Sequence, residues 1–304
     1  MSTEKNLLVG VDYSTHSQNA LREAARIANA HEYTLICYHV LDKDILESFR
    51  KMEAYTEEGV LNFANEKIAD FIRETIGTAH RVEAQVYIGH PFEVTLKLIE
   101  QFKPVSLVLG SRGLSSGEQS HVGALASRCI RKAPVEVLLV RGFHDRPFER
   151  IVACVDFSEN SLRAAHRAAE LAKQDKAHLQ LIHINQSPVY TDQSFGWLGP
   201  ALPVSPPDDL EANLKERLEE VASDLAERCS LPTRPSTQVV SSMSVHEGIY
   251  QDLKNEKADL IVMGTRGRTG FKKLLLGTTA EKLIYQTPCS TLAVKPADFT
   301  FSLH

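Results

Sequence analysis

The chain contains the same domain-sized sequence pattern twice, and this duplication is the strongest constraint on its fold. Asp12 and Asp156 each follow a short apolar run, and a serine stands two residues after each of them. Matching residues continue in register without gaps as far as His39 and His183, which are 144 positions apart. At the later glycine motifs the separation is 154 positions, so the second copy has ten additional residues. Solenoid repeats have periods of only about 20–50 residues, so the repeated unit here is a whole domain.

The length of the chain agrees with two domains. A chain of 304 residues provides about 150 residues for each copy, which is a common domain size. We therefore predict one domain over residues 1–143 and a second over residues 147–304, with a short linker from Gly142 to Pro147. The apolar fraction of 43% is ordinary for globular proteins, so each half can bury a core of its own.

Charge and cysteine content narrow the class of protein. A formal net charge of −5, without any Lys/Arg run, argues against a nucleic-acid-binding protein. No apolar run approaches the ~18 residues of a membrane span, and polar residues 2–6 do not resemble a signal peptide. Five cysteines without a C-x-x-C pair are typical of reduced thiols. We expect a cytoplasmic protein with no membrane span, in which Cys37 and Cys154 are small core residues.

Both halves alternate short apolar strand patterns with amphipathic helical patterns. Five strands separated by helices predict a doubly wound α/β domain with an open, five-stranded parallel sheet. Ligands bind such sheets at the carboxyl ends of the strands, where the strand order reverses. In the first half the predicted strands are 7–11, 34–40, 82–88, 105–109 and 135–140, and the second half repeats this order.

A glycine motif follows a predicted strand in both copies. The second copy reads Gly264-Thr265-Arg266-Gly267 and is followed by Gly277-Thr278, whereas the first reads Gly110-Ser111-Arg112-Gly113 and is followed by Gly123-Ala124. Glycine allows a close backbone approach, and a helix N-terminus directs N–H groups at anions, so this pattern favours a phosphate site. The alternative is a tight strand-to-helix turn with a solvated basic face.

These motifs resemble those of the universal stress protein family. The pattern G-x-x-G, nine residues, then G-[S/T] is similar to the ATP-binding signature of that family, and Gly264, Gly267, Gly277 and Thr278 match it in full. The Asp156-Phe157-Ser158 run also resembles the opening motif of the family. The likeness covers nearly the whole chain as two tandem copies. It implies a Rossmann-like, adenine-nucleotide-binding fold and a stress-response regulator that binds ATP or another adenine nucleotide, with or without Mg²⁺.

The resemblance also implies roles for individual residues of the second copy. The adenosine part would be held by Asp156 and by the backbone near Val155 and Ile184, and the terminal phosphates by a helix start. Threonine hydroxyls and backbone amides can both donate to phosphate oxygens, although Thr278 could equally be a simple helix N-cap. The full predicted set is Val155, Asp156, Ile184, Met263, Gly264, Arg266, Gly267, Arg268, Gly277, Thr278 and Thr279.

The first copy departs from the signature. Ala124 stands where Thr278 does, and register matching places Leu114, Glu118 and Gln119 opposite Arg268, Lys272 and Lys273. At an effective dielectric near 20, one charge ~6 Å from another is worth roughly 2–3 kcal/mol, so triphosphate binding should be much weaker here. We therefore expect the second domain to be the main nucleotide site. The weaker site of the first copy would comprise Asp12, Val40, Gly110, Arg112, Gly113 and Gly123.

Catalysis has little support in the sequence. There is no P-loop, no dinucleotide fingerprint and no kinase motif set. His39 and His183 favour packed, hydrogen-bonded histidines over ligands. His90 and His121 could bind a metal only if the fold brings acidic or cysteine partners to them. Two alternatives to a regulator remain: a slow phosphohydrolase or nucleotidyl-transfer enzyme that depends on Asp156, and a scaffold that binds no ligand.

Two further features concern partners. The segment from Gln186 to Asp209 contains five prolines and the only tryptophan, and it could be a lid, a proline-stiffened surface loop or a partner-contact arm. The last strands of the two copies, 135–140 and 289–295, are apolar and predicted at sheet edges, where pairing is favoured. We expect them to pair within the chain, two chains to form a homodimer, and an unknown regulatory protein to be the partner.

Overall fold

The computed structural model describes residues 5–50, 56–78, 81–113, 122–142, 146–186, 208–267 and 276–301. It divides into two compact units, one of Met1–Asp145 with Cys289–His304 and one of Arg146–Pro288. Residues 143–145 of the predicted linker and most of the proline-rich segment lie outside the described residues. The same holds for these predicted residues: Leu114, Glu118, Gln119, His121, Arg268, Lys272 and Lys273.

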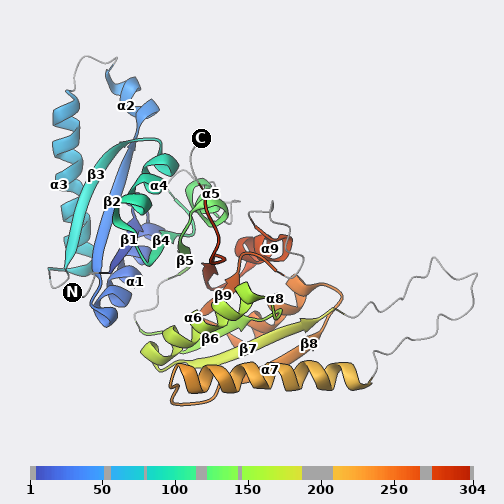
Figure 1. Cartoon of the computed structure of the whole chain (residues 1–304). Coiled ribbons are helices and arrows are strands. Elements are labelled where there is room, and N and C mark those ends of the chain that lie inside the picture. Colours follow the sequence, from blue (N-terminus) through green and yellow to red (C-terminus); the bar gives the residue numbers. More distant parts are fainter. Residues whose placement is uncertain are drawn as a thin grey trace, which may run out of the picture. The chain divides into compact units, whose positions relative to one another are not determined.

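The first unit is a doubly wound sheet flanked by helices (Figure 1). Its strand order is β3-β2-β1-β4-β5-β10, in which the first five strands are parallel and β10 is antiparallel to β5. In chain order the elements are β1 (Asn6–Gly10), α1 (Thr15–His31), β2 (Thr34–Asp42), α2 (Lys43–Arg50), α3 (Glu57–Ile76), β3 (Val82–Gly89), α4 (Pro91–Phe102), β4 (Ser106–Gly110), α5 (Ala124–Lys132), β5 (Glu136–Val140) and β10 (Ser290–Val294).

The second unit repeats this winding with four parallel strands in the order β9-β6-β7-β8. Its elements are β6 (Arg150–Cys154), α6 (Glu159–Asp175), β7 (His178–Asn185), α7 (Asp208–Arg228), β8 (Ser236–Ser241), α8 (Val245–Glu256), β9 (Leu260–Gly264) and α9 (Thr278–Gln286). The predicted strands are confirmed to within one or two residues at each end. The short helix α2 was not predicted.

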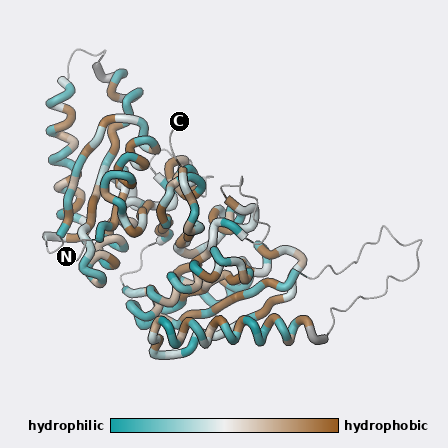
Figure 2. Tube along the Cα trace, viewed as in Figure 1, coloured by the Kyte–Doolittle hydropathy of each residue, from teal (hydrophilic) through white to brown (hydrophobic). Residues whose placement is uncertain are grey.

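Apolar strands and amphipathic helices build the core of each unit. The central strands are largely hydrophobic along their length, whereas hydrophilic and hydrophobic residues alternate along α3 and α7 (Figure 2). Helices α1 and α6 bury alanines at helical spacing, among them Ala20, Ala24, Ala164 and Ala168, none of which has exposed surface. Small side chains let these helices approach the sheet closely, so that α1 contacts β1 and β4, and α6 contacts β6 and β9.

The fifth strand of the second sequence copy lies in the first unit. β10 pairs with β5 through Thr291–Leu139, Leu292–Leu138 and Ala293–Val137, so the predicted pairing of the two last strands is confirmed. The following residues pack on the same unit, where Phe299 is buried and Phe301 lies edge-on to Phe92. Since β5 now has β4 on one side and β10 on the other, its edge is used within the chain. The domain limits at 143 and 147 remain predictions about the two sequence copies.

Candidate functional site

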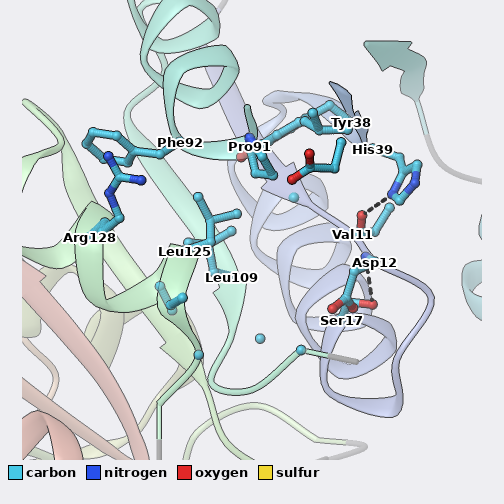
Figure 3. Close-up of a pocket in the computed structure, with 18 of the residues that line it drawn as sticks. Val11, Asp12, Ser17, Tyr38, His39, Pro91, Phe92, Leu109, Leu125 and Arg128 are labelled. Carbon is cyan, nitrogen blue, oxygen red and sulfur yellow. Dashed lines mark hydrogen bonds between the residues drawn. The ribbon is translucent and has the colours of Figure 1, made fainter. Parts of the chain in front are cut away.

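A cavity lies at the carboxyl ends of the strands in each unit, at the point where the strand order reverses. The cavity of the first unit, between the ends of β1 and β4, has a volume of about 640 Å³ (Figure 3). The cavity of the second unit, at the ends of β6 and β9, has a volume of about 560 Å³. Both volumes fall within the range of about 300–1,000 Å³ that is usual for small-molecule sites. The rule that ligands bind where the strand order reverses, applied to the sequence, therefore predicted the position of both cavities.

An aspartate at the end of the first strand of each copy forms one wall. The carboxylate of Asp156 accepts hydrogen bonds from the N–H and the hydroxyl of Ser158, at 2.9 and 2.5 Å. The Ser158 hydroxyl in turn accepts from Ser161 N–H and so caps α6. Asp12 repeats the arrangement with Ser14, at 3.1 and 2.6 Å. Because Oδ1 of each aspartate is held in this way, the carboxylate has a fixed position beside the glycine loop.

The aromatic residue inside each Asp-x-Ser turn is in the left-handed region. Tyr13 has φ 67° and Phe157 has φ 62°, conformations that cost non-glycine residues about 1–3 kcal/mol. The cost is offset by packing, because the Tyr13 ring lies 4.5 Å from the His39 ring and the Phe157 ring 4.7 Å from the His183 ring. Side-chain cations from the long helices cover the same rings, Lys67 over Tyr13 and Arg217 over Phe157.

Both histidines are held by a backbone carbonyl. Nδ1 of His39 lies 2.8 Å from Val11 O, and Nδ1 of His183 lies 2.7 Å from Val155 O. A carbonyl oxygen only accepts, so Nδ1 carries the proton in each case. Burial lowers the pKa of His39, although the bond to Val11 O opposes this effect. The two histidines are structural, as expected, and they also line the cavities.

The glycine loop is closed by one backbone hydrogen bond in each copy. Gly277 N–H donates to Thr265 O at 2.9 Å, and Gly123 N–H donates to Ser111 O at 2.8 Å. These bonds join the end of a strand to the start of α9 or α5. As a result, the N–H groups of the first helical turn point away from the helix body with no intrahelical acceptor. This is the arrangement that suits an anion.

The loop glycines are required by close contacts. A Cβ on Gly264 would lie 2.7 Å from Nδ2 of Asn160, and one on Gly267 would lie 2.8 Å from Oδ2 of Asp156. Among the described residues, a Cβ on Gly277 would meet only Thr265 O, at an ordinary 3.5 Å. Gly264 and Gly267 therefore allow the loop to pack on α6 and on Asp156, whereas Gly277 leaves room on the cavity side.

The predicted site residues converge on these two cavities. In the second unit all of them line the cavity except Arg268, which lies outside the described residues. In the first unit all six line it as well: Asp12, Val40, Gly110, Arg112, Gly113 and Gly123. The structure places these residues together. It does not test whether they bind a ligand.

Three expectations about these residues change. Gly277 N–H is bonded to Thr265 O and is therefore not a donor for a ligand. Val155 N–H donates to Ile182 O at 2.9 Å, so it is not a donor for a ligand either. Cys154 was expected in the core, but it is partly exposed and lines the cavity of the second unit, whereas Cys37 is fully buried. Gly10 occupies the position of Cys154 in the first unit, and a Cβ there would lie 2.9 Å from the Tyr38 hydroxyl.

One difference between the two cavities lies at the helix start. α5 begins Ala124-Leu125 where α9 begins Thr278-Thr279, so both hydroxyl donors are replaced by apolar side chains. Leu125 lines the first cavity, together with Arg128, whose guanidinium lies 4.3 Å from the centre of the Phe92 ring (Figure 3). The volume of the first cavity is not reduced. Compared with the second cavity, the first therefore lacks hydrogen-bond donors but is not smaller.

Sequence reasoning missed the apolar wall of the second cavity. Four of its members come from the start of α7 and from α8, elements far from the motifs in sequence, and Leu283 comes from α9. Nothing in the sequence indicated that the apolar face of α7 ends at the cavity. The missed apolar residues are Leu210, Leu214, Val245, Ile249 and Leu283.

The profile described as "Universal stress protein family" matches residues 4–141 and again residues 147–295. The chain belongs to the universal stress protein family. A universal stress protein of Mycolicibacterium smegmatis is 25% identical over 309 residues, which covers 97% of this chain and 98% of that protein. The tandem arrangement is thus shared along the whole length of a relative.

One solved structure shows the same fold over nearly the whole chain. A universal stress protein from Archaeoglobus fulgidus superposes with a TM-score of 0.64 at 20% identity, covering 95% of this chain and 98% of its own. Another universal stress protein, solved in complex with cAMP, covers 49% of this chain with a TM-score of 0.37 and 21% identity. In the parts of the chain that the structure describes, no helix has both the length and the apolar character needed to cross a membrane.

Proposed function

We propose that this universal stress protein binds ATP or another adenine nucleotide in the cavity of its second unit, and that occupancy regulates its interactions. The observation that carries the proposal is the convergence of three elements on one cavity of about 560 Å³: Asp156, the loop from Gly264 to Gly267, and the start of α9. The family resemblance of these motifs supports the same ligand.

The phosphate end of the nucleotide would lie at the start of α9. Thr278 and Thr279 each offer a hydroxyl and an N–H, and both side chains line the cavity. Arg266 lines it too, and adds a guanidinium that can bond two phosphate oxygens. Hydrogen bonds to a charged group are worth about 1.5–3 kcal/mol each, so a few such donors account for micromolar binding.

The base end would lie against the apolar wall. Met263, Val245 and Ile249 offer an apolar surface, and the carbonyl of Val155, which accepts from His183 Nδ1, has a second lone pair for a ligand donor. Among the described lining residues Asp156 is the carboxylate, and its Oδ1 already accepts two bonds from Ser158. Because Mg²⁺ prefers several oxygen ligands, we expect it to enter on the nucleotide phosphates and not in a protein cage.

The first unit would bind triphosphates weakly or take a different ligand. Ala124 and Leu125 remove the two hydroxyl donors while the cavity stays about 640 Å³. The protein would therefore carry one main ATP site per chain. A regulatory partner, a homodimer and a cytoplasmic location belong to this proposal. Since β5 is paired on both sides, a homodimer would use another surface.

Calorimetric titration of the full chain with Mg-ATP tests the proposal. We expect one site per chain, and we expect Gly277→Val to lower the affinity by about 100-fold or more, because its side chain would occupy the space of a phosphate. The fold should tolerate this change, since a Cβ at 277 meets only Thr265 O at 3.5 Å. An unchanged melting temperature separates a blocked site from a damaged fold.

Two matched variants complete the test. The double variant Thr278→Ala/Thr279→Leu copies the helix start of the first unit into the second and should also abolish tight binding. Gly123→Val makes the equivalent change in the first unit and should leave ATP affinity unaltered. Two equal sites in the wild-type protein, or equal losses for Gly123→Val and Gly277→Val, would contradict the proposal. Intact ATP released on denaturation would favour a regulator over a hydrolase.

A further inference from the structure

Three metal-ligating side chains meet at the rim of the cavity in the first unit. Asp42 ends β2, Asp44 lies in the first turn of α2, and His90 is the residue before α4. One ligand atom from each of the three lies within 4.8 Å of the other two. His90 was expected to bind a metal only if the fold brings acidic partners to it. The fold meets this condition.

Strand pairing explains why these residues meet. Asp42 pairs with Gly89 in the parallel register of β2 and β3, so the next residue, His90, lies beside the end of β2. Asp44 N–H donates to Oδ1 of Asp42 at 3.0 Å, which turns the chain into α2 and keeps the second carboxylate close. The three ligands thus come from two strand ends and a helix start, all fixed by backbone hydrogen bonds.

The ligand chemistry selects the class of ion. One imidazole nitrogen and two carboxylate oxygens suit Zn²⁺ and related divalent transition metals, whereas Mg²⁺ and Ca²⁺ prefer oxygen alone. With bonds of about 2.0–2.2 Å, ligand atoms around a tetrahedral Zn²⁺ lie about 3.4 Å apart. The observed spacing of up to 4.8 Å closes to this value by small side-chain rotations, because Asp44 and His90 are exposed and Asp42 is only half-buried.

The position of the cluster gives the ion a role. Asp42 and His90 line the cavity itself, so three protein ligands would leave a coordination position open toward a ligand held there. This cavity lacks the two threonine donors of its counterpart. A divalent cation at the rim would attract an anionic ligand by its positive charge, in place of the missing hydrogen-bond donors.

The sequence duplication provides an internal comparison. Gln186 and Ser244 occupy the positions of Asp42 and His90 in the second copy, and neither residue is a strong ligand for transition metals. Within the described ranges, no second group of three His, Cys, Asp or Glu side chains meets the same spacing. We infer that Asp42, Asp44 and His90 form a site for one Zn²⁺-class ion that is specific to the first unit.

Titration of the chelator-treated full chain with Zn²⁺, followed by calorimetry, tests this site. We expect one ion per chain. Asp42→Asn and His90→Gln should each lower the affinity at least about tenfold, since even outer-shell partners of a metal are worth about 10–100-fold. Neither change should affect the fold, because asparagine keeps the acceptor for Asp44 N–H and the His90 side chain makes no capping hydrogen bond.

Controls distinguish this site from other zinc ligands. Glu93→Gln alters a carboxylate that lines the same cavity outside the cluster and should leave the affinity within about twofold. Cys154→Ser removes the partly exposed thiol and should also have no effect. Co²⁺ should give visible d–d absorption without a thiolate band, and His90→Gln should abolish it. Wild-type affinity in the His90→Gln variant, or loss of binding in Cys154→Ser, would overturn the assignment.

Discussion

Replacement of Gly110 by alanine is expected to destabilise the first unit by about 3 kcal/mol, which corresponds to more than a hundredfold change in its unfolding equilibrium. A Cβ at this position would lie 2.7 Å from the carbonyl carbon of His16, 2.8 Å from its oxygen and 2.9 Å from Ser17 N. All three atoms belong to the backbone of the first turn of α1. They cannot move without separating α1 from β4, so the substitution disrupts the packing of the unit and lowers its free energy of unfolding.

The equivalent change in the second copy should be milder. A Cβ on Gly264 meets the amide group of Asn160, at 2.7 and 3.0 Å, and a side-chain end can rotate away. Its backbone contact, with the Asn160 carbonyl carbon at 3.1 Å, is less close than the backbone contacts at Gly110. We expect about 1–2 kcal/mol for Gly264→Ala and less than about 0.5 kcal/mol for Gly277→Ala. Hydrogen exchange followed by mass spectrometry, read on peptides of each unit, measures the three values. Equal losses at positions 110 and 264 would show that the backbone contact with α1 is not the cause.

Replacement of Asp259 by alanine is expected to destabilise the second unit by about 3–4 kcal/mol. The Asp259 carboxylate is buried, with 6% of its side chain exposed, and it accepts two bonds from the Arg146 guanidinium, at 3.0 and 3.1 Å. It also accepts from the N–H groups of Glu149 and Arg150, at 2.7 and 3.1 Å. Removing the carboxylate leaves the Arg146 guanidinium and the N–H groups of Glu149 and Arg150 without this acceptor at the entry to β6. Asp259→Asn keeps the shape and should cost less.

The same carboxylate predicts a pH dependence. Burial by itself would raise the pKa of Asp259, but the bonds from Arg146 and from the two N–H groups outweigh it and lower the pKa below its ordinary value of 3.8. Because the pKa of Asp259 is lower in the folded than in the unfolded state, its ionised carboxylate stabilises the folded unit fully above the unfolded-state pKa, near pH 4. This stabilisation is lost as the pH falls through the folded-state pKa.

Urea unfolding of the second unit between pH 7 and pH 2 measures this linkage. The wild-type protein should lose stability more steeply below pH 4 than Asp259→Ala does, and the two curves should converge at low pH. Glu256→Gln is a matched control, because its pairing with Arg150 is half-exposed and surface pairs contribute only about 0–1 kcal/mol. Parallel curves for wild type and Asp259→Ala would contradict the lowered pKa.

Local sequence patterns predicted most of the fold. Strand positions came from apolar runs, and helix positions came from amphipathic patterns, because burial of one face imposes a fixed period. The crossover rule then placed Asp156 and Gly264 at one end of the sheet without any structure. The helix α2 was missed, because eight residues after a strand carry too little periodicity to be distinguished from a loop.

The sequence by itself determined that a domain is repeated, that each copy is doubly wound, and which loops can approach an anion. These properties follow from local periodicity and from the backbone freedom of glycine, and both depend only on residues that are neighbours in the sequence. Only the tertiary structure decided that Gly277 N–H is used within the loop, that Cys154 faces a cavity, and that His90 meets Asp42. Each of these depends on which distant backbone lies opposite, and a linear pattern does not contain that information.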